Sequence, residues 1–277
     1  MEKWRLIDTG INNAYYNMAV DEAIMKASRK DLVPPTIRFY QWSPPGLTLG
    51  YSQTGKQVVN EKKCKQNQVD VVRRLTGGRT ILHDDELTYS IIVKEDSGIL
   101  PGSIIDSYKI ISEGIVKGFK ILNIPVDLKP FDKNKSRDKG FSAACFDSPS
   151  WYEVLINGKK LVGSAQTRRK GIILQHGSLP FSIDAEKLYN LLKINGDRKN
   201  KIRNKMVKRF LNKATAVNNV SEKNISPGEL KKSLKKGWET VFKVSLKPGS
   251  LIQQEKIWVK KLIREKYKTR EWNYREK

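Results

Sequence analysis

The sequence predicts an α+β domain in which helices flank a mixed, largely antiparallel sheet. Helical and β-rich stretches are interspersed along the chain. Residues 150–180 have the pattern of a β meander, with Asn157-Gly158 as a two-residue hairpin turn and a second turn at 168–171. Hairpin strands are antiparallel, so we expect an antiparallel element at the centre of the domain.

In the first half of the chain, helices are expected from apolar periodicity. Residues 12–28 place apolar side chains on one side of a helix, and Pro34-Pro35 prevent its continuation. Residues 104–122 keep a helical apolar period throughout. Strands are expected at residues 36–40, 70–74 and 87–93.

In the second half, a helix start is marked by Ser226-Pro227-Gly228-Glu229, which combines an N-cap serine, a proline at the first helical position and a capping-box glutamate. This helix should run to about Phe242. Residues 251–267 place Ile257, Leu262 and Ile263 among lysines, which favours a surface helix.

Composition and charge limit the classes of function that we expect for this chain. The chain has 277 residues, of which 38% are hydrophobic, and no apolar run has the roughly 20 residues that a membrane span needs. The first residues lack a signal-peptide core, so we expect a cytoplasmic protein without membrane association. Cys64 and Cys145 lie far apart without metal-type spacing, which predicts free thiols and no metal site.

The net charge of +24 is unevenly distributed. Residues 1–185 contribute +7, and residues 186–277 contribute +17. Such a surface attracts polyanions, either nucleic acid or an acidic protein. Zinc-finger spacing, aromatic RNA-binding signatures and basic leucine-zipper heptads are all missing from the sequence, so nucleic acid is the less expected partner.

A candidate site lies around a Gly-Gly turn in residues 73–90. Arg73, Arg74 and Arg79 supply planar donors for an anion, and glycines permit close approach of the backbone to a ligand. An ordinary β turn with solvated arginines would have the same pattern, and His83 could be structural.

The string RRLTGGRTILHD (73–84) resembles the signature of the biotin/lipoate protein ligase superfamily. The resemblance implies a ligase-like catalytic domain over residues 1–245, with its motifs within 33–185, and a basic helical tail over 246–277. It also implies that this string lines an acyl-group pocket. The implied substrate-binding residues are Arg73, Arg74, Thr76, Gly77, Gly78 and His83. Arg79 replaces a third glycine that is common in lipoate–protein ligases.

Further segments match the same superfamily in order. KLVGSAQ (160–166) resembles its Lys-x-x-Gly-Ser-Ala strand and QHGS (175–178) its His-Gly-Ser strand, while residues 17–23 and 271–273 match as well. The resemblance implies that Lys160 reaches the reacting carbonyl. It further implies substrate-binding roles for Gly163, Ser164, Ala165 and His176.

Within the superfamily, residues 142–149 resemble the Ala-Cys-Phe segment of octanoyl-[acyl-carrier-protein]:protein N-octanoyltransferases that use a cysteine nucleophile. This resemblance implies that Cys145 is catalytic, although most free cysteines are small buried hydrophobes. Cys64 lies in a polar stretch, Glu61 to Lys65, and we expect it to be an exposed bystander.

The chemistry requires no cofactor, because one thioester exchanges for another and aminolysis to an amide is downhill. It does require a thiolate. Lowering a thiol pKa from about 8.5 to about 6 needs about 3.4 kcal/mol. One ammonium about 4 Å away at an effective dielectric near 20 supplies about 4 kcal/mol. Lys160 can be that ammonium.

We therefore expect an octanoyltransferase of lipoate assembly. Octanoyl-acyl carrier protein would be the donor, and a lipoyl-domain protein such as the glycine cleavage system H protein the acceptor. Two alternatives remain: an ATP-dependent lipoate–protein ligase, in which Cys145 would be incidental, and a basic nucleic-acid-binding protein on the same fold.

Overall fold

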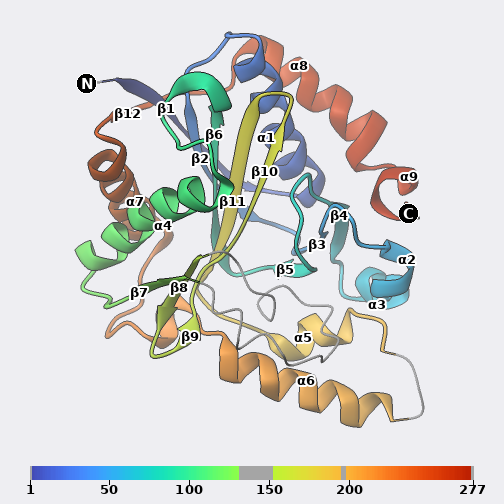
Figure 1. The fold of residues 1–277 in the computed structure, drawn as a ribbon. Coiled ribbons are helices and arrows are strands. Elements are labelled where there is room, and N and C mark those ends of the chain that lie inside the picture. Colours follow the sequence, from blue (N-terminus) through green and yellow to red (C-terminus); the bar gives the residue numbers. More distant parts are fainter. Residues whose placement is uncertain (1, 131–151, 195–197, 276–277) are drawn as a thin grey trace.

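A six-stranded mixed sheet forms the centre of the computed structural model, which describes residues 2–130, 152–194 and 198–275 (Figure 1). In the strand order β10-β11-β6-β2-β1-β12, the first four strands pair antiparallel, while β1 pairs parallel with both β2 and β12. The predicted fold class is confirmed. The strands are β1 (Lys3–Asn12), β2 (Thr36–Trp42), β6 (Glu86–Lys94), β10 (Gly163–Arg169), β11 (Ile172–Pro180) and β12 (Ser245–Pro248).

Helices cover both faces of this sheet (Figure 1). On one face, α4 (Ile104–Ile121) and α7 (Pro227–Phe242) pack on a core that includes Ile91 and Val93. On the other, α1 (Ala14–Arg29) and α8 (Gln253–Leu262) pack on a core that includes Ile92. Successive strand residues point to opposite faces, so one continuous apolar strand can serve two cores.

The predicted helices α1, α4 and α7 are confirmed. Each begins at a polar cap: the side chains of Asn13, Ser103 and Ser226 accept hydrogen bonds from backbone N–H groups three residues later. The capping box of Ser226 and Glu229 is complete. These helices were predictable because their start signals are local.

The segment predicted as one meander forms two hairpins in two different sheets. β8 (Tyr152–Ile156) and β9 (Lys159–Lys160) join β7 (Asp127–Pro130), whereas β10 and β11 belong to the central sheet. Both turns have the positive φ angles of tight hairpin turns, at Asn157-Gly158 and at Lys170-Gly171. The buried pair Leu161 and Val162 carries the chain from one sheet to the other.

A third sheet and core complete the domain. In this sheet β3 is the middle strand, parallel to β4 and antiparallel to β5. Its core includes Leu47 and Leu49 together with Tyr189 and Phe210 from two helices below it. The elements are β3 (Gly46–Leu49), β4 (Asp70–Arg73), β5 (Ile81–His83), α2 (Gly55–Val58), α3 (Glu61–Gln66), α5 (Ala185–Asn190), α6 (Lys199–Lys213) and α9 (Arg270–Asn273).

The C-terminal residues are joined to the central sheet. β12 crosses the boundary predicted at residue 245 and pairs with β1. In α8, Val259 and Leu262 are buried against the α1 side of the sheet, while Ile257 is 50% exposed. The division into 1–245 and 246–277 stays a prediction. Within the described ranges, no helix combines the length and apolarity that crossing a membrane requires.

Cys64 corrects one expectation. Its side chain is buried, with 2% exposed, in the core beneath β3 rather than on the polar surface. The spacing of α3 turns this one residue inward, while its lysine neighbours remain outside. Burial, followed by the charge of Glu61, raises the pKa of the Cys64 thiol to about 12. Cys64 is therefore unreactive at neutral pH.

Candidate active site

A largely apolar hollow, the central pocket, lies where α1, β2, β3, β5, β6, β10 and β11 meet. Met18, Tyr40, Trp42 and Ile81 supply its large side chains. The predicted substrate-binding residues that line it are Arg74, His83, Gly163, Ser164, Ala165 and His176. The structure thus brings three separate sequence motifs to one cavity.

The β10–β11 pairing explains why Gly177 lies in this wall. Ser164 pairs with Gly177 across the two strands. A Cβ on Gly177 would lie 2.4 Å from Oγ of Ser164 and 2.5 Å from Cε1 of Tyr89. The missing side chain lets these two hydroxyl groups approach to 2.9 Å at the pocket wall.

His176 belongs to a buried network that fixes its ring. Nε2 lies 2.6 Å from Oγ1 of Thr76, and Nδ1 lies 3.6 Å from Oδ2 of Asp21. Burial opposes the charge of Asp21, yet Arg38 and His176 together hold the pKa of Asp21 below its ordinary value. Burial outweighs the attraction of Asp21 and lowers the pKa of His176. Since the ordinary pKa of histidine is about 6.5, the imidazole is neutral at neutral pH.

His83, which also lines the pocket, has a different setting. Its Nδ1 lies 2.9 Å from Oε1 of Glu86, and its Nε2 lies 2.9 Å from Oγ1 of Thr48. The ring stacks on Trp42 with centroids 4.1 Å apart. Glu86 also accepts a 2.6 Å hydrogen bond from Ser178. This buried network orients both the histidine and the indole that faces the pocket.

The guanidinium groups of the arginine pair both donate to backbone carbonyls. Arg74 lines the pocket but donates to Thr48, Gly77 and Arg79. Arg73 points away from the pocket and is 0% exposed. It donates to carbonyl oxygens of Gly50, Tyr51, Trp272 and Asn273. Arg73 therefore anchors the C-terminal α9.

The glycine turn supports the pocket from outside. Gly77 and Gly78 do not contribute to the lining, and Thr76 reaches it only through His176. A Cβ on Gly50 would lie 1.9 Å from the carbonyl oxygen of Gly78, whose φ is +88°. Close backbone packing thus requires glycine at position 50 and the positive φ favours it at 78, whereas a Cβ on Gly77 would meet nothing within 4 Å.

Lys160 lies on β9, one edge of the small sheet, and is 4% exposed. Its Nζ donates a 3.1 Å hydrogen bond to Oε1 of Glu153 on β8. Leu161 and Val162 separate it in sequence from Gly163 of the pocket lining. The predicted nucleophile Cys145 lies outside the described residues.

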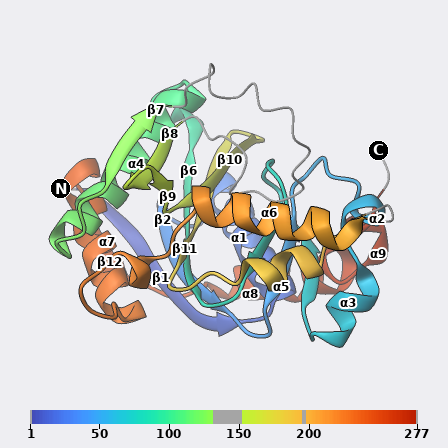
Figure 2. The same ribbon diagram turned by 90° about the horizontal axis from the view of Figure 1, so that it is seen from below.

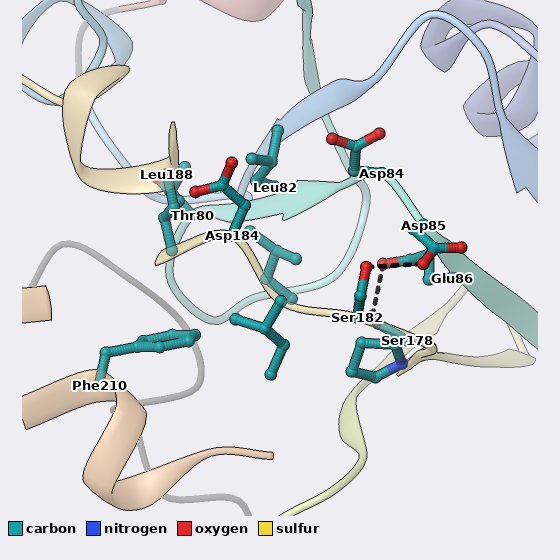
Figure 3. Close-up of a pocket in the computed structure, with 13 residues that line it drawn as sticks. Thr80, Leu82, Asp84, Asp85, Glu86, Ser178, Ser182, Asp184, Leu188 and Phe210 are labelled. Carbon is teal, nitrogen blue, oxygen red and sulfur yellow. Dashed lines mark hydrogen bonds between the residues drawn. The ribbon is translucent and has the colours of Figure 1, made fainter. Parts of the chain in front are cut away.

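A second hollow, the acidic hollow, lies beside the central pocket and shares Ile81 and Ser178 with it. Figure 3 shows Asp84, Asp85 and Glu86 on one side and Asp184 on another, with Phe210 of α6 across the opening. Asp85 accepts a hydrogen bond from Ser182, and Asp84 pairs with Lys187 at 2.5 Å. These carboxylates are thus partnered by groups of the same region.

Several residues in the pocket wall or hydrogen-bonded behind it were missed from sequence. Asp21 and Met18 lie within the matched segment 17–23, and a polar residue in the apolar side of that helix was an available signal. Glu86 begins a strand that is buried on both faces, where an acid needs partners. Trp42 gave no signal. Among the described residues, no group of three or more acids, histidines or cysteines could hold a metal ion.

Comparisons with known proteins show which family the chain belongs to. Residues 13–239 match the model of the lipoyl protein ligase A/B catalytic domain. The octanoyltransferase LipM of Halalkalibacterium halodurans is 43% identical and that of Bacillus subtilis 42% identical, each alignment covering 99% of this chain and at least 99% of the relative.

Solved structures show the same fold. A bipartite lipoate protein ligase from Thermoplasma acidophilum, studied with its E2 lipoyl domain, has a TM-score of 0.81 at 24% identity, covering 99% of this chain and 97% of that one. A lipoate-protein ligase A bound with ATP has a TM-score of 0.78 at 23% identity, covering 99% of each chain. The family match and the full-length relatives lead to one assignment: the chain belongs to the lipoyl protein ligase A/B family, in its octanoyltransferase group.

Proposed function

We propose that this octanoyltransferase takes its acyl group from octanoyl-acyl carrier protein and transfers it, through a thioester on Cys145, to a lysine of a lipoyl-domain protein such as the glycine cleavage system H protein. The central pocket carries this proposal, because residues from the matched motifs line it together. The full-length similarity to octanoyltransferases supports it. The reaction belongs in the cytoplasm, where thiols stay reduced.

The pocket has the chemistry that an octanoyl chain needs. Burial of an alkyl chain stabilises the complex by about 0.8 kcal/mol per CH₂. Met18, Tyr40, Trp42 and Ile81 offer that burial, and the Arg74 guanidinium, which also lines the pocket, already donates to carbonyl oxygens. Chain binding at this site would hold the thioester carbonyl near the strand that leads to Lys160.

The transfer balances without a cofactor. In the first step the Cys145 thiolate attacks the thioester carbonyl, the new C–S bond forms, and the pantetheine thiolate leaves and takes up a proton. In the second step the neutral amine of the acceptor lysine attacks the Cys145 thioester. The amide bond forms, the C–S bond breaks, and the proton lost by nitrogen restores the thiol.

Lys160 is the proposed charge beside the nucleophile. Its burial keeps the effective dielectric low, which makes an ammonium more effective on a neighbouring thiolate than it is in water. Glu153 shares this ammonium at 3.1 Å and so competes with the thiolate for it. The Lys160–Glu153 pair therefore sets how much positive charge reaches the site.

The test is acylation without acceptor. Wild-type protein incubated with octanoyl-acyl carrier protein should form a hydroxylamine-labile octanoyl adduct on Cys145, located by mass spectrometry of peptides. Cys64→Ser is the matched control and should acylate normally, since Cys64 is buried. An adduct on Cys64, or full transfer by Cys145→Ser, would refute the mechanism.

The same assay separates the ligase alternative. Free octanoate with ATP, added to acceptor domain in place of the carrier thioester, should give no product. Acceptor octanoylation that requires ATP would assign the chain to adenylate chemistry and leave Cys145 without a role.

A further inference from the structure

One helix, α6, contributes +7 of the +17 carried by residues 186–277. α6 carries seven Lys or Arg residues and no Asp or Glu in its 15 positions. By contrast, α7 carries four lysines with two glutamates, and its Lys231 and Lys235 pair with Asp8 and Glu239. The cations of α7 are therefore partly neutralised within the molecule, whereas α6 has no acid of its own.

One face of α6 is anchored and the other is exposed. Val207 and Phe210 are buried, and the Phe210 ring packs edge-on to Tyr189 of α5 with centroids 6.0 Å apart. Lys201, Lys205 and Lys208, here called the lysine strip, follow at i, i+4 and i+7 on the exposed side. Within the described ranges, none of the three forms an ion pair.

The position of α6 links the lysine strip to the site. Directly after the helix, Ala214 pairs with Lys160, and the Thr215 N–H donates a 3.0 Å hydrogen bond to the Lys160 carbonyl. Figures 1 and 2 both show one end of α6 beside β9, with the rest extending away under α5. The lysine strip spans about 10 Å at roughly 1.5 Å per residue, and α6 continues from it toward Ala214, the residue that pairs with Lys160.

We infer that the lysine strip of α6 is the docking surface for the donor, an acidic carrier protein that presents the octanoyl thioester on a flexible arm. This inference rests on the donor proposed above. Exposed cations without internal partners favour an acidic protein surface by charge complementarity. Ile202 and Leu211, 41% and 43% exposed on the same helix, add apolar contacts of the kind found in interfaces.

The position of α6 favours the donor carrier protein over the acceptor domain as the partner that docks there. A lysine side chain is short, so the acceptor domain must lie directly over the reacting carbonyl. A thioester on a prosthetic arm can reach the site from a carrier that is docked along a track leading away from Lys160. The two half-reactions should therefore differ in their dependence on α6.

The experiment measures each half-reaction with charge-reversed enzyme. The variant K201E/K205E/K208E is compared with K232E/K236E/K256E, which changes the net charge equally at exposed lysines of α7 and α8. At low ionic strength we expect the α6 variant to lose about tenfold or more in kcat/KM for octanoyl-acyl carrier protein, and the control much less. With octanoyl-pantetheine, which has no carrier protein, both variants should match wild type within about twofold.

Two further measurements vary the ionic strength and follow the second half-reaction by itself. The difference between variants should shrink as ionic strength approaches 1 M, where screening acts over about 3 Å. Pre-acylated α6 variant should transfer to a lipoyl domain at a rate close to wild type. Circular dichroism and urea unfolding confirm that both variants are folded.

Results that contradict the docking inference differ from those that contradict the proposed function. Equal losses in the two variants, a loss with octanoyl-pantetheine of the same size, or slowing confined to transfer onto the lipoyl domain would each overturn the docking inference. Duplex DNA binding that the α6 variant loses, with carrier acylation unchanged, would also overturn it. If wild type accepts octanoyl from neither donor, the proposed function fails instead.

Discussion

The buried cations of this chain and the exposed cations of α6 differ in what satisfies their charge. Arg38 is 0% exposed and donates to Thr9, Asn17 and Asp21, and its guanidinium lies 3.9 Å from the Tyr40 ring centroid. Exposed lysines of α6, such as Lys205, depend on water. A planar guanidinium with five donors can be satisfied inside a protein, whereas a compact ammonium is more strongly hydrated.

The cations that make up the net charge of +24 therefore have different roles. Arg38, Arg73 and Arg74 use their charge to hold the backbone around the central pocket and contribute little to long-range attraction. The cations left at the surface without internal partners determine which macromolecules are attracted. Substitutions of the buried cations and of the exposed lysines test this difference.

The largest effect is expected for Arg38→Met. It leaves Asp21 charged and buried without its main partner, which should lower the free energy of unfolding by about 3–5 kcal/mol. Urea unfolding measures the loss. Addition of Asp21→Asn should restore part of it, because the two residues interact directly. A loss below about 1 kcal/mol would mean that this interior pair is as weak as a surface pair.

Substitutions of Lys160 test the role of the buried lysine that is proposed to act on a ligand. Lys160→Ala should raise the pH at which Cys145 reacts with iodoacetamide by about one to three units. Lys160→Arg should keep much of the reactivity while slowing transfer if the lysine also moves a proton. Glu153→Gln should shift the profile toward lower pH, since the competing carboxylate is lost. Identical profiles in wild type and Lys160→Ala would exclude Lys160 as the activating charge.

Arg73→Met distinguishes a structural from a ligand-binding arginine. The change leaves carbonyls of the 50–51 turn and of α9 without a donor, and we expect a loss of about 1.5–3 kcal/mol in stability. Hydrogen exchange should become faster in α9 than in α4. The KM for the octanoyl donor should stay near the wild-type value. A selective rise in KM with unchanged stability would restore the predicted anion-binding role.

Titration of His176 should have a smaller effect on the free energy of unfolding, and this effect depends on pH. Its folded pKa lies below the unfolded value of about 6.5, so below that pH the unfolded state binds more protons. Its contribution to stability is therefore present above pH 6.5 and is lost as the pH falls. Urea unfolding of wild type between pH 7.5 and 5 should show this loss, and His176→Gln should be flatter. Parallel curves would show that His176 does not titrate differently on folding.

The smallest effect is expected on α6. Neutralisation of the lysine strip by K201A/K205A/K208A should change the free energy of unfolding by no more than about 0.5 kcal/mol, because these side chains are exposed and hold no ion pair in the described structure. A loss above about 1 kcal/mol in urea unfolding would show that these lysines stabilise the fold after all.

The sequence by itself determined the elements whose signals are local. An apolar period lies within the helix itself, which made α1 and α4 predictable, and the cap and proline at the start of α7 act within one turn. The turns at Asn157-Gly158 and Lys170-Gly171 were predictable from their own residues as well. The matched motifs also identified much of the pocket wall, such as Ser164 and His176.

Only the tertiary structure decided the direction in which each polar side chain points. Arg73 meets Asn273, 200 residues away, and Asp21 meets His176 where α1 packs on the central sheet. Cys64 points into a core that residues 185–214 help to build. Such contacts depend on how sheets and helices pack, because a buried polar group is satisfied by whichever distant donor or acceptor the packing brings to it. The adjacent residues Arg73 and Arg74 therefore have the same local sequence and different surroundings.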